Sequence, residues 1–478
     1  MYITLIVVSL IVLLCIFLNK ALYRFGVPSL LVFLVLGMLM GSDGIGGIYF
    51  DNFDIAEEVS YFALVFIMFY GGFGTKWDTA KPVAVKAGIM SSLGTVITAV
   101  VIGFFCSIIF GVPFLYGLLF GSIVGSTDAA SVFSILRSRK LNLKNGLAPL
   151  LELESGSNDP FAYMMTTLTI SVIQVQGEDM GVFSIVGTIA AQIGIAVTIG
   201  TVIAVATVFV LKHLNLEVDG FYPILIFAII ILSFSLCSMI GGNGFLCVYI
   251  LGIIVGNSSF FNKISTVNFF DSISWIMQIM LFFILGLLSF PSHLPSVAIP
   301  GIIISVLLIV AARPLATFSI LSWFRVPFKD QILVSWVGLR GAASIVFAVV
   351  AIKAFGDGLP YDLFHLVFFV ALFSVMIQGT LMPLIANKLD LVDKDDENAV
   401  MKTFTDYFDE TNTNLSEYRI TKSDRFWGKC IAQADIPENI LILLIKRGDG
   451  IILPKGSTEF MEDDILVMSG DGQLSMQN

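Results

Sequence analysis

Charged side chains are scarce in this chain of 478 residues. Asp, Glu, Lys and Arg make up 13% of it, against about a quarter in soluble domains, and apolar side chains make up 57%. This composition excludes an ordinary soluble enzyme. Because lipid offers the backbone no hydrogen-bond partners, apolar runs of about 20 residues predict membrane-spanning helices. We expect an integral membrane protein.

Cysteine and histidine are also rare, and neither forms a motif. None of the five Cys lies in a CxxC pair, so we expect neither disulfides nor a cysteine-bound metal. The three histidines, His213, His293 and His365, lie far apart in the sequence and are expected in or beside loops, at most as modest pH sensors. The sequence therefore predicts no cofactor.

The net charge of −10 is concentrated at the C-terminal end. Residues 390–478 contain 9 of the 26 Lys and Arg but 18 of the 36 Asp and Glu, which makes nucleic acid an unsuitable partner. We divide the chain into a membrane domain (1–389), an acidic linker (390–416) and a small α+β cytoplasmic domain (417–478). In this last domain, short runs of alternating polarity predict strands at 417–420, 440–447, 450–453 and 464–468. Its core is marginal in size, so we expect pairing with a second copy.

Apolar runs predict about 13 membrane spans, which makes residues 1–389 an all-α polytopic membrane protein. The spans are 2–19, 28–41, 58–73, 84–110, 113–137, 146–174, 182–211, 221–240, 243–257, 267–290, 297–320, 332–353 and 362–388. With the N-terminus outside, the inner loops hold fourteen Lys and Arg and the outer loops hold only Lys353. By the positive-inside rule we expect the N-terminus outside, the C-terminus in the cytoplasm and a location in the cell (inner) membrane.

Polar residues interrupt two of these spans. Gly125-Ser126-Thr127-Asp128 breaks the span 113–137, and Gly338-Leu339-Arg340-Gly341 breaks the span 332–353. These are the fifth and twelfth spans, and because an odd number separates them they cross the membrane in opposite directions. Paired interruptions indicate inverted repeats with two broken, crossed helices at a transport site.

Charged residues inside spans are functional candidates, because burying a charge in lipid is unfavourable. They are Asp128, Glu152, Glu154, Asp159, Arg313 and Arg340. On the sixth span, Ser155 and Asp159 share one helix face, while Glu154 and Asn158 share the neighbouring one. At about 1.5 Å per residue, Asp159 and Asp128 both lie roughly 20 Å deep, so they can meet near the middle of the membrane.

Carbonyl, hydroxyl and carboxylate oxygens at this depth suit a hard alkali cation better than a soft metal. Two other interpretations stay open: Thr127 and Asp128 cap a helix end, or Asp159 is a buried structural carboxylate. Glu152 is two residues from Glu154 and lies on another face, so we expect it to be an entrance or interface charge.

These motifs resemble those of the cation:proton antiporter-1 family, of NhaP type. The resemblance covers the whole membrane domain and rests on Thr127-Asp128, Glu154-Ser155-Gly156-Ser157-Asn158-Asp159-Pro160, Arg313-Pro314 and Gly338-Leu339-Arg340-Gly341-Ala342. It implies a homodimer with a thirteen-helix inverted-repeat fold. It also implies that a moving core exchanges H⁺ for Na⁺ or K⁺ by alternating access.

The family's roles carry over to the matching residues of this chain. Asp159 would bind either a proton or the cation, and the rest of the cation site would be Ser155, Thr127, Asp128 and Asn158. Asn158 stands where electrogenic relatives have a second aspartate, so the resemblance implies electroneutral one-for-one exchange.

Four further residues have implied roles or depart from the family pattern. Glu154 and Arg313 would form a structural ion pair, and Arg340 would compensate the ends of the broken helices. Tyr70 stands where many relatives have an acidic residue, which leaves ion selectivity open. Its phenol could donate to Asp159, replace a ligand weakly or only pack.

The C-terminal domain resembles the TrkA C-terminal (RCK-C) domain over its full length. The matching motifs include Trp427-Gly428-Lys429, Lys446-Arg447 and Leu453-Pro454-Lys455-Gly456-Ser457-Thr458. The resemblance implies a regulatory module that binds a small cytoplasmic ligand such as a nucleotide. It favours K⁺ as the transported ion without excluding Na⁺.

Three other functions stay open on the sequence. A tail-gated cation channel is disfavoured because the chain lacks a TVGYG-like filter. A small-anion solute carrier is disfavoured by the two carboxylates expected at the midplane. A membrane enzyme is disfavoured because no serine, histidine and acid share a common depth. We therefore expect a transporter and not an enzyme.

Overall fold

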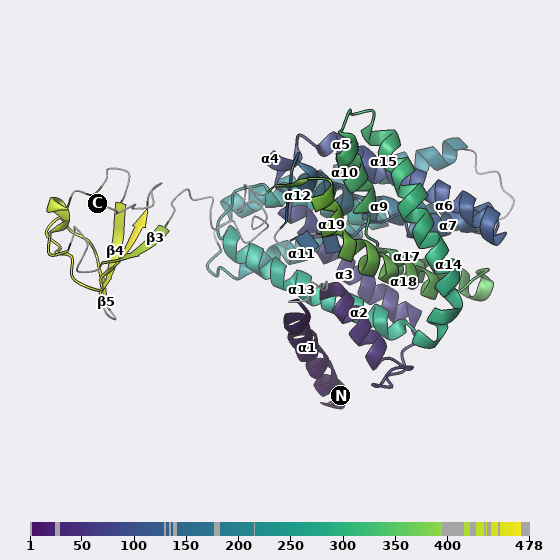
Figure 1. Cartoon of the computed structure of the whole chain (residues 1–478), viewed down its shortest axis with the longest axis horizontal. Coiled ribbons are helices and arrows are strands. Elements are labelled where there is room, and N and C mark those ends of the chain that lie inside the picture. Colours follow the sequence, from purple (N-terminus) through teal and green to yellow (C-terminus); the bar gives the residue numbers. More distant parts are fainter. Residues whose placement is uncertain are drawn as a thin grey trace. The chain divides into compact units, whose positions relative to one another are not determined.

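The computed structural model describes residues 2–23, 29–128, 131–132, 135–136, 141–175, 182–214, 216–393, 415–420, 427–434, 436, 441–447 and 450–469. The chain divides into two compact units, residues 1–403 and 404–478. The first unit is helical, and the second is built on a β-sheet (Figure 1).

The helices of the first unit follow the predicted spans closely. Before residue 129 they are α1 (Tyr2–Tyr23), α2 (Ser29–Met40), α3 (Phe53–Gly74), α4 (Trp77–Ala80), α5 (Ala84–Ile89), the π-turn η1 (Met90–Gly94), α6 (Thr95–Phe110) and α7 (Phe114–Ile123). After residue 140 they are α9 (Leu147–Gln174), α10 (Val182–His213), α11 (Phe221–Met239), α12 (Gly244–Gly256), α13 (Lys263–Leu288), η2 (Pro291–His293), α14 (Leu294–Leu307), η3 (Leu308–Ala312), α15 (Arg313–Leu321), α16 (Phe328–Trp336), α17 (Ala342–Phe355), η4 (Gly356–Gly358), α18 (Leu363–Phe373), η5 (Ser374–Gly379) and α19 (Thr380–Lys388).

Six helical segments in the described residues are long and apolar enough to cross a membrane. They are Ala84–Phe110, Phe183–His213, Phe221–Met239, Lys263–Leu288, Pro291–Leu321 and Leu363–Lys388, and five shorter helices are also apolar. A mostly helical protein with several membrane spans is therefore confirmed. Each predicted span contains at least one helix, but thirteen crossings, the inverted repeats and the crossing of the broken helices stay predictions.

Both predicted interruptions are present. Helix α7 ends at Ile123, and residues 124–128 are not helical; helix α16 ends at Trp336, and α17 begins at Ala342. The glycines and polar residues of these two segments disfavour the helix locally. The interruptions are thus a property of the sequence itself.

Glycines let the helices around α9 approach one another closely. A Cβ on Gly72 of α3 would lie 2.2 Å from the carbonyl oxygen of Tyr249 in α12. One on Gly37 of α2 would lie 2.3 Å from the carbonyl oxygen of Phe283 in α13. Backbones are therefore in direct contact at both crossings, as in other membrane bundles. Helix α9 itself packs against α3, α7, α12 and α17.

A short ribbon joins the end of the first unit to the segment before α9. Strand β1 (Asn142–Leu143) pairs antiparallel with β2 (Val392–Asp393). Leu391 and Val392 are buried in the same cluster as Leu147 and Val337. The sequence analysis placed Leu391 to Asp393 in the linker 390–416, because a strand of two residues is too short to show a periodic pattern. In the structure these residues belong to the first unit.

The second unit contains a four-stranded antiparallel sheet in the order β3-β6-β4-β5. The strands are β3 (Leu415–Arg419), β4 (Leu441–Arg447), β5 (Gly450–Ile452) and β6 (Ile465–Ser469). All four predicted strands are confirmed, and none of their ends differs by more than two residues. Alternating polarity located them because one face of the sheet packs on a small core around Ile445, Phe460 and Leu466.

An ion pair between a buried carboxylate and a partly exposed guanidinium ties β4 to the turn before β6. Both oxygens of Asp464 accept hydrogen bonds from Arg447, each at 2.8 Å, and one also accepts from the N–H of Met461. Burial alone would raise the pKa of the Asp464 carboxyl, but the bonds from Arg447 and Met461 hold this pKa below its ordinary value.

Candidate functional site

The two helix interruptions lie against each other. The backbone N–H of Asp128 donates to the carbonyl oxygen of Leu339 (2.8 Å), and the guanidinium of Arg340 donates to the carbonyl oxygen of Ser126 (2.8 Å). A helix that stops inside a membrane leaves backbone groups without partners. Here each interruption supplies partners for the other.

Gly341 makes this close approach possible. A Cβ at this position would lie 2.3 Å from Oδ2 of Asp128, closer than any side chain allows. The carboxylate of Asp128 also accepts a hydrogen bond from Ser131 (2.6 Å). Arg340, next to Gly341, is 2% exposed, and its own N–H donates to the hydroxyl of Ser374 (3.1 Å). A half-buried carboxylate and a buried guanidinium therefore lie where the interruptions meet.

Asp159 lies on α9 beside the first interruption. Its residue is 9% exposed, and Oδ1 accepts a hydrogen bond from the hydroxyl of Ser126. Asp159 and Asp128 both line a cavity of about 40 Å³, enough for a water molecule or one small ion. The rest of the cavity wall is largely apolar: Leu30, Leu64, Ile67, Met68, Gln278, Leu281, Phe282, Ala342 and Ala343. Asp159 and Asp128 thus line the same cavity, while their predicted role as cation ligands stays a prediction.

The other predicted ligands form a separate hydrogen-bonded group. Oγ1 of Thr127 lies 3.1 Å from Oγ of Ser155. The amide of Asn158 accepts from the N–H of Thr127 (3.2 Å) and donates to its hydroxyl. These three residues are not in the wall of the cavity that the described residues form at Asp159 and Asp128. The structure therefore divides the predicted cation site into a cavity and an adjoining polar group.

A buried ion pair completes this part of the first unit. Nη1 and Nη2 of Arg313 donate to the two oxygens of Glu154, at 2.9 and 2.8 Å. The side chains are 4% and 1% exposed. Such a bidentate pair combines charge with fixed geometry. The structure contains the pair that the family resemblance implied, while its role as a brace stays a prediction.

The structure gives contacts to three polar residues that the sequence analysis assigned no role: Asp271, Ser126 and Gln278. Tyr70 donates a hydrogen bond to Asp271 on α13, a partner that none of its three predicted roles anticipated. Asp271 lies inside the predicted span 267–290, and its charge within an apolar span is the signal by which the sequence indicates it. Ser126, which bonds Asp159, was signalled only by its place in the first interruption. Gln278 was signalled only by being polar within a span.

Residues 8–388 match the family model described as "Sodium/hydrogen exchanger, transmembrane", and residues 415–474 match the "TrkA-C domain". The chain therefore belongs to the sodium/hydrogen exchanger family. It carries a TrkA-C domain at its C-terminal end.

Two relatives and one solved structure show how far the similarity extends. The chain is 34% identical over 452 residues to the "K(+)/H(+) antiporter NhaP2" of Shewanella baltica, covering 94% of this chain and 77% of that protein. It is 39% identical over 371 residues to the "K(+)/H(+) antiporter NhaP" of Alkalimonas amylolytica, covering 77% and 63%. The sodium proton antiporter MjNhaP1 from Methanocaldococcus jannaschii superposes with a TM-score of 0.70 at 23% identity, over 81% of this chain and 99% of that one. The last comparison shows a shared fold.

Proposed function

We propose that this protein exchanges a monovalent cation, K⁺ or Na⁺, for a proton across the membrane. Asp159 binds either ion in turn. The observation that carries the proposal is the buried carboxylate of Asp159 in an ion-sized cavity, beside the meeting point of two interrupted helices. The names of the relatives support the reaction, and K⁺ is the first ion to test because both bacterial relatives are named for it.

The charges around the cavity favour the exchange of one proton for one monovalent cation. Glu154 is neutralised by Arg313, and Asn158 carries no charge. The meeting point of the interruptions contributes one guanidinium and one carboxylate, which balance. Asp159 is left with one negative charge, and either one proton or one cation neutralises it. Electroneutral exchange follows because an unneutralised buried carboxylate is strongly disfavoured.

The transport cycle that we propose is alternating access in a homodimer. Two ions that exclude each other from one carboxylate couple their movements without ATP, a cofactor or a covalent step, so the protein is a transporter and not an enzyme. The protein lies in the cell (inner) membrane with its N-terminus outside. The TrkA-C domain lies in the cytoplasm, where a small ligand such as a nucleotide regulates exchange.

The proposal predicts that Asp159→Asn abolishes exchange while the protein still folds. The substitution removes the charge at nearly constant volume, so neither ion is held. Exchange in proteoliposomes, followed as dissipation of a pH gradient on addition of K⁺ or Na⁺, should fall to the level of protein-free vesicles. Asp51→Asn, in the exposed loop before α3, is the matched control and should exchange as wild type. Wild-type exchange by folded Asp159→Asn protein would rule the mechanism out.

Electroneutrality has its own test. On a solid-supported membrane, saturating Na⁺ or Rb⁺ with an opposing pH gradient should give no sustained current, because each cycle moves equal charge in both directions. K⁺ with valinomycin is unsuitable because the clamp ion would also be the substrate. A steady current that scales with the turnover rate would contradict one-for-one exchange, whereas a brief binding transient is compatible with it.

A further inference from the structure

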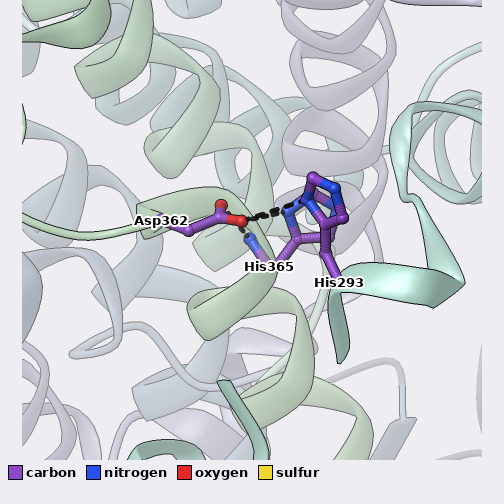
Figure 2. Close-up of side chains that lie close together, drawn as sticks. All are labelled: His293, Asp362 and His365. Carbon is purple, nitrogen blue, oxygen red and sulfur yellow. Dashed lines mark hydrogen bonds and ion pairs between the residues drawn. The ribbon is translucent and has the colours of Figure 1, made fainter. Parts of the chain in front are cut away.

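Folding brings two of the three histidines together with an aspartate (Figure 2). Nδ1 of His365 lies 2.7 Å from Oδ2 of Asp362, and Nδ1 of His293 lies 3.5 Å from the same oxygen. His293 belongs to η2, between α13 and α14, whereas Asp362 and His365 lie at the start of α18. His293 and His365 lie far apart in the sequence, but the packing of α14 beside α18 brings them together.

Hydrogen bonds assign the tautomer of His365. The backbone N–H of Phe290 donates to Nε2 of His365 (3.0 Å), so Nε2 must present a lone pair. Nδ1 then carries the ring proton and donates it to Asp362. The neutral ring of His365, which is buried, thus links the first turn of α18 to the turn that follows α13.

This tautomer is incompatible with a metal centre. Two histidines and an aspartate within 4.8 Å of one another have suitable ligands. A metal-bound imidazole, however, usually donates its second N–H to an acceptor. With a metal on Nδ1, the proton of His365 would move to Nε2 and face the N–H of Phe290. Adding a proton at Nε2 of the neutral ring has the same effect, because two donors, the ring N–H and the N–H of Phe290, then face each other.

We propose that His365, Asp362 and His293 form a proton-responsive latch between α18 and the turn joining α13 to α14. The latch is closed while neutral His365 accepts the hydrogen bond from Phe290. Protonation at Nε2 replaces the acceptor with a donor, so this bond breaks while Asp362 keeps its bond to Nδ1. Imidazole titrates between about pH 5 and pH 8, so acidification opens the latch.

His293 strengthens the response. Its ring centroid lies 4.8 Å from that of His365, and its side chain is 57% exposed, so solvent reaches the ring. When both rings are charged they repel each other, because the rings are in contact. Asp362, the carboxylate that both rings contact, carries a single negative charge.

The other charged groups on neighbouring segments do not compete for His365. In the loop after α2, Asp43 accepts hydrogen bonds from the N–H and hydroxyl of Ser292, and these bonds hold the pKa of this exposed carboxyl below its ordinary value. Asp43 therefore stays charged throughout the range and favours cationic rings nearby. Lys353 of α17 pairs with Asp54 and Glu57 of α3, at 3.0 and 2.6 Å.

Helix α13 connects the latch to the exchange site. Gln278, Leu281 and Phe282 of α13 line the cavity at Asp159, and Phe290 follows the end of this helix. An open latch releases this end from α18, so protons on the latch side, which the charge distribution predicts to be outside, regulate exchange. This last step rests on the proposed function, whereas the latch itself does not.

The test of the latch uses the full-length protein and needs no transport. The variant His365→Gln replaces the titrating ring with an amide whose oxygen can still accept from Phe290. Hydrogen exchange of the Phe290 amide, corrected for intrinsic rates, should lose protection about fivefold or more in wild type from about pH 8 to about pH 5. His365→Gln should show no such loss, and His213→Gln, at the end of α10, should behave as wild type. Unchanged wild-type protection, or the same loss in His365→Gln, would overturn the latch.

A second measurement covers the case in which His365→Gln does not fold. The measurement is the ¹⁵N NMR spectrum of histidine-labelled wild type, in which the ring signals are assigned with the variants His213→Gln and His293→Gln. Nε2 of His365 should be unprotonated at about pH 8 and protonated at about pH 5. Coordination of added Zn²⁺ by the His365 ring at neutral pH would overturn the tautomer assignment. For transport, His365→Gln should flatten the dependence of exchange on latch-side pH. An unchanged profile, with Asp159→Asn inactive, would reject regulation by the latch while leaving the proposed function intact.

Discussion

Single residues decide whether the first unit can hold its buried charges. Glu154 and Arg313 form two parallel hydrogen bonds with almost no exposure to solvent. Taking two charges out of water is unfavourable, so the pair adds little net stability compared with apolar residues. Removing one partner is different, because the other charge is then buried without compensation.

Glu154→Ala should therefore destabilise the protein by about 3–5 kcal/mol. The measurement is the midpoint of thermal unfolding in detergent, together with the yield of purified protein. Glu152→Ala, two residues away on another face of α9, is the control and should change the midpoint less. The double variant Glu154→Ala with Arg313→Ala should be more stable than the sum of the single effects predicts. A Glu154→Ala protein as stable as wild type would refute the brace.

At the scale of elements, the decisive contact is between the two interrupted helices. The N–H of Asp128 and the carbonyl oxygen of Leu339 are paired across it, and Gly341 provides the space. Neither interruption satisfies all of its backbone groups locally, and the bonds between the two supply part of what is missing. A change that separates them should disturb the position of Asp128 in the cavity more than it disturbs the surrounding bundle.

Gly341→Ala should consequently impair exchange. The new Cβ would collide with the carboxylate of Asp128, and overpacking of this kind usually destabilises by about 1–3 kcal/mol, which a bundle of this size can tolerate. We expect folded protein whose exchange rate in proteoliposomes is strongly reduced. Gly194→Ala in α10 is the matched control, since a Cβ there has open space around it. Exchange at the wild-type rate by Gly341→Ala would show that the close approach is unnecessary.

At the scale of the whole molecule, the chain divides into two units, residues 1–403 and 404–478, and β2 belongs to the first. The last residues before the undescribed segment, Leu391 to Asp393, pack or pair with the first unit. The TrkA-C domain contains none of the cavity residues. We expect it to bias a two-state equilibrium of the transporter, which requires a ligand with different affinity for the two states.

Because Leu391 to Asp393 pack or pair with the first unit, the residue at which the chain is truncated should decide whether the first unit stays stable. A chain ending at Asp393 should keep cation/proton exchange and change only its dependence on pH or ligand. A chain ending at Lys388 also loses β2 and the buried Leu391 and Val392, so its unfolding temperature should be lower. Both are measured by thermal unfolding and by exchange in proteoliposomes. A stable Asp393 truncation that exchanges no ions at any pH would assign part of the transport to the tail.

The sequence by itself determined those features that depend on the residues of one short stretch: the apolar helices, their interruptions and the strands. Partition into lipid depends on the polarity of about 20 consecutive residues, so the apolar helices of the first unit were located, six of them long enough to cross a membrane. Glycine and polar residues weaken a helix where they stand, so both interruptions were located too. The strands of the tail followed from alternating polarity. Asp159 was singled out because a charge in an apolar span is conspicuous wherever it lies.

Only the tertiary structure decided which of these residues meet. The sequence does not say that Ser126 bonds Asp159, that Tyr70 bonds Asp271, or that His293 lies beside His365. Such contacts join side chains that are tens or hundreds of residues apart. Their distances depend on how close the helices approach and on how each is rotated about its axis. Those quantities are set by packing of the whole first unit, which no single stretch of sequence contains.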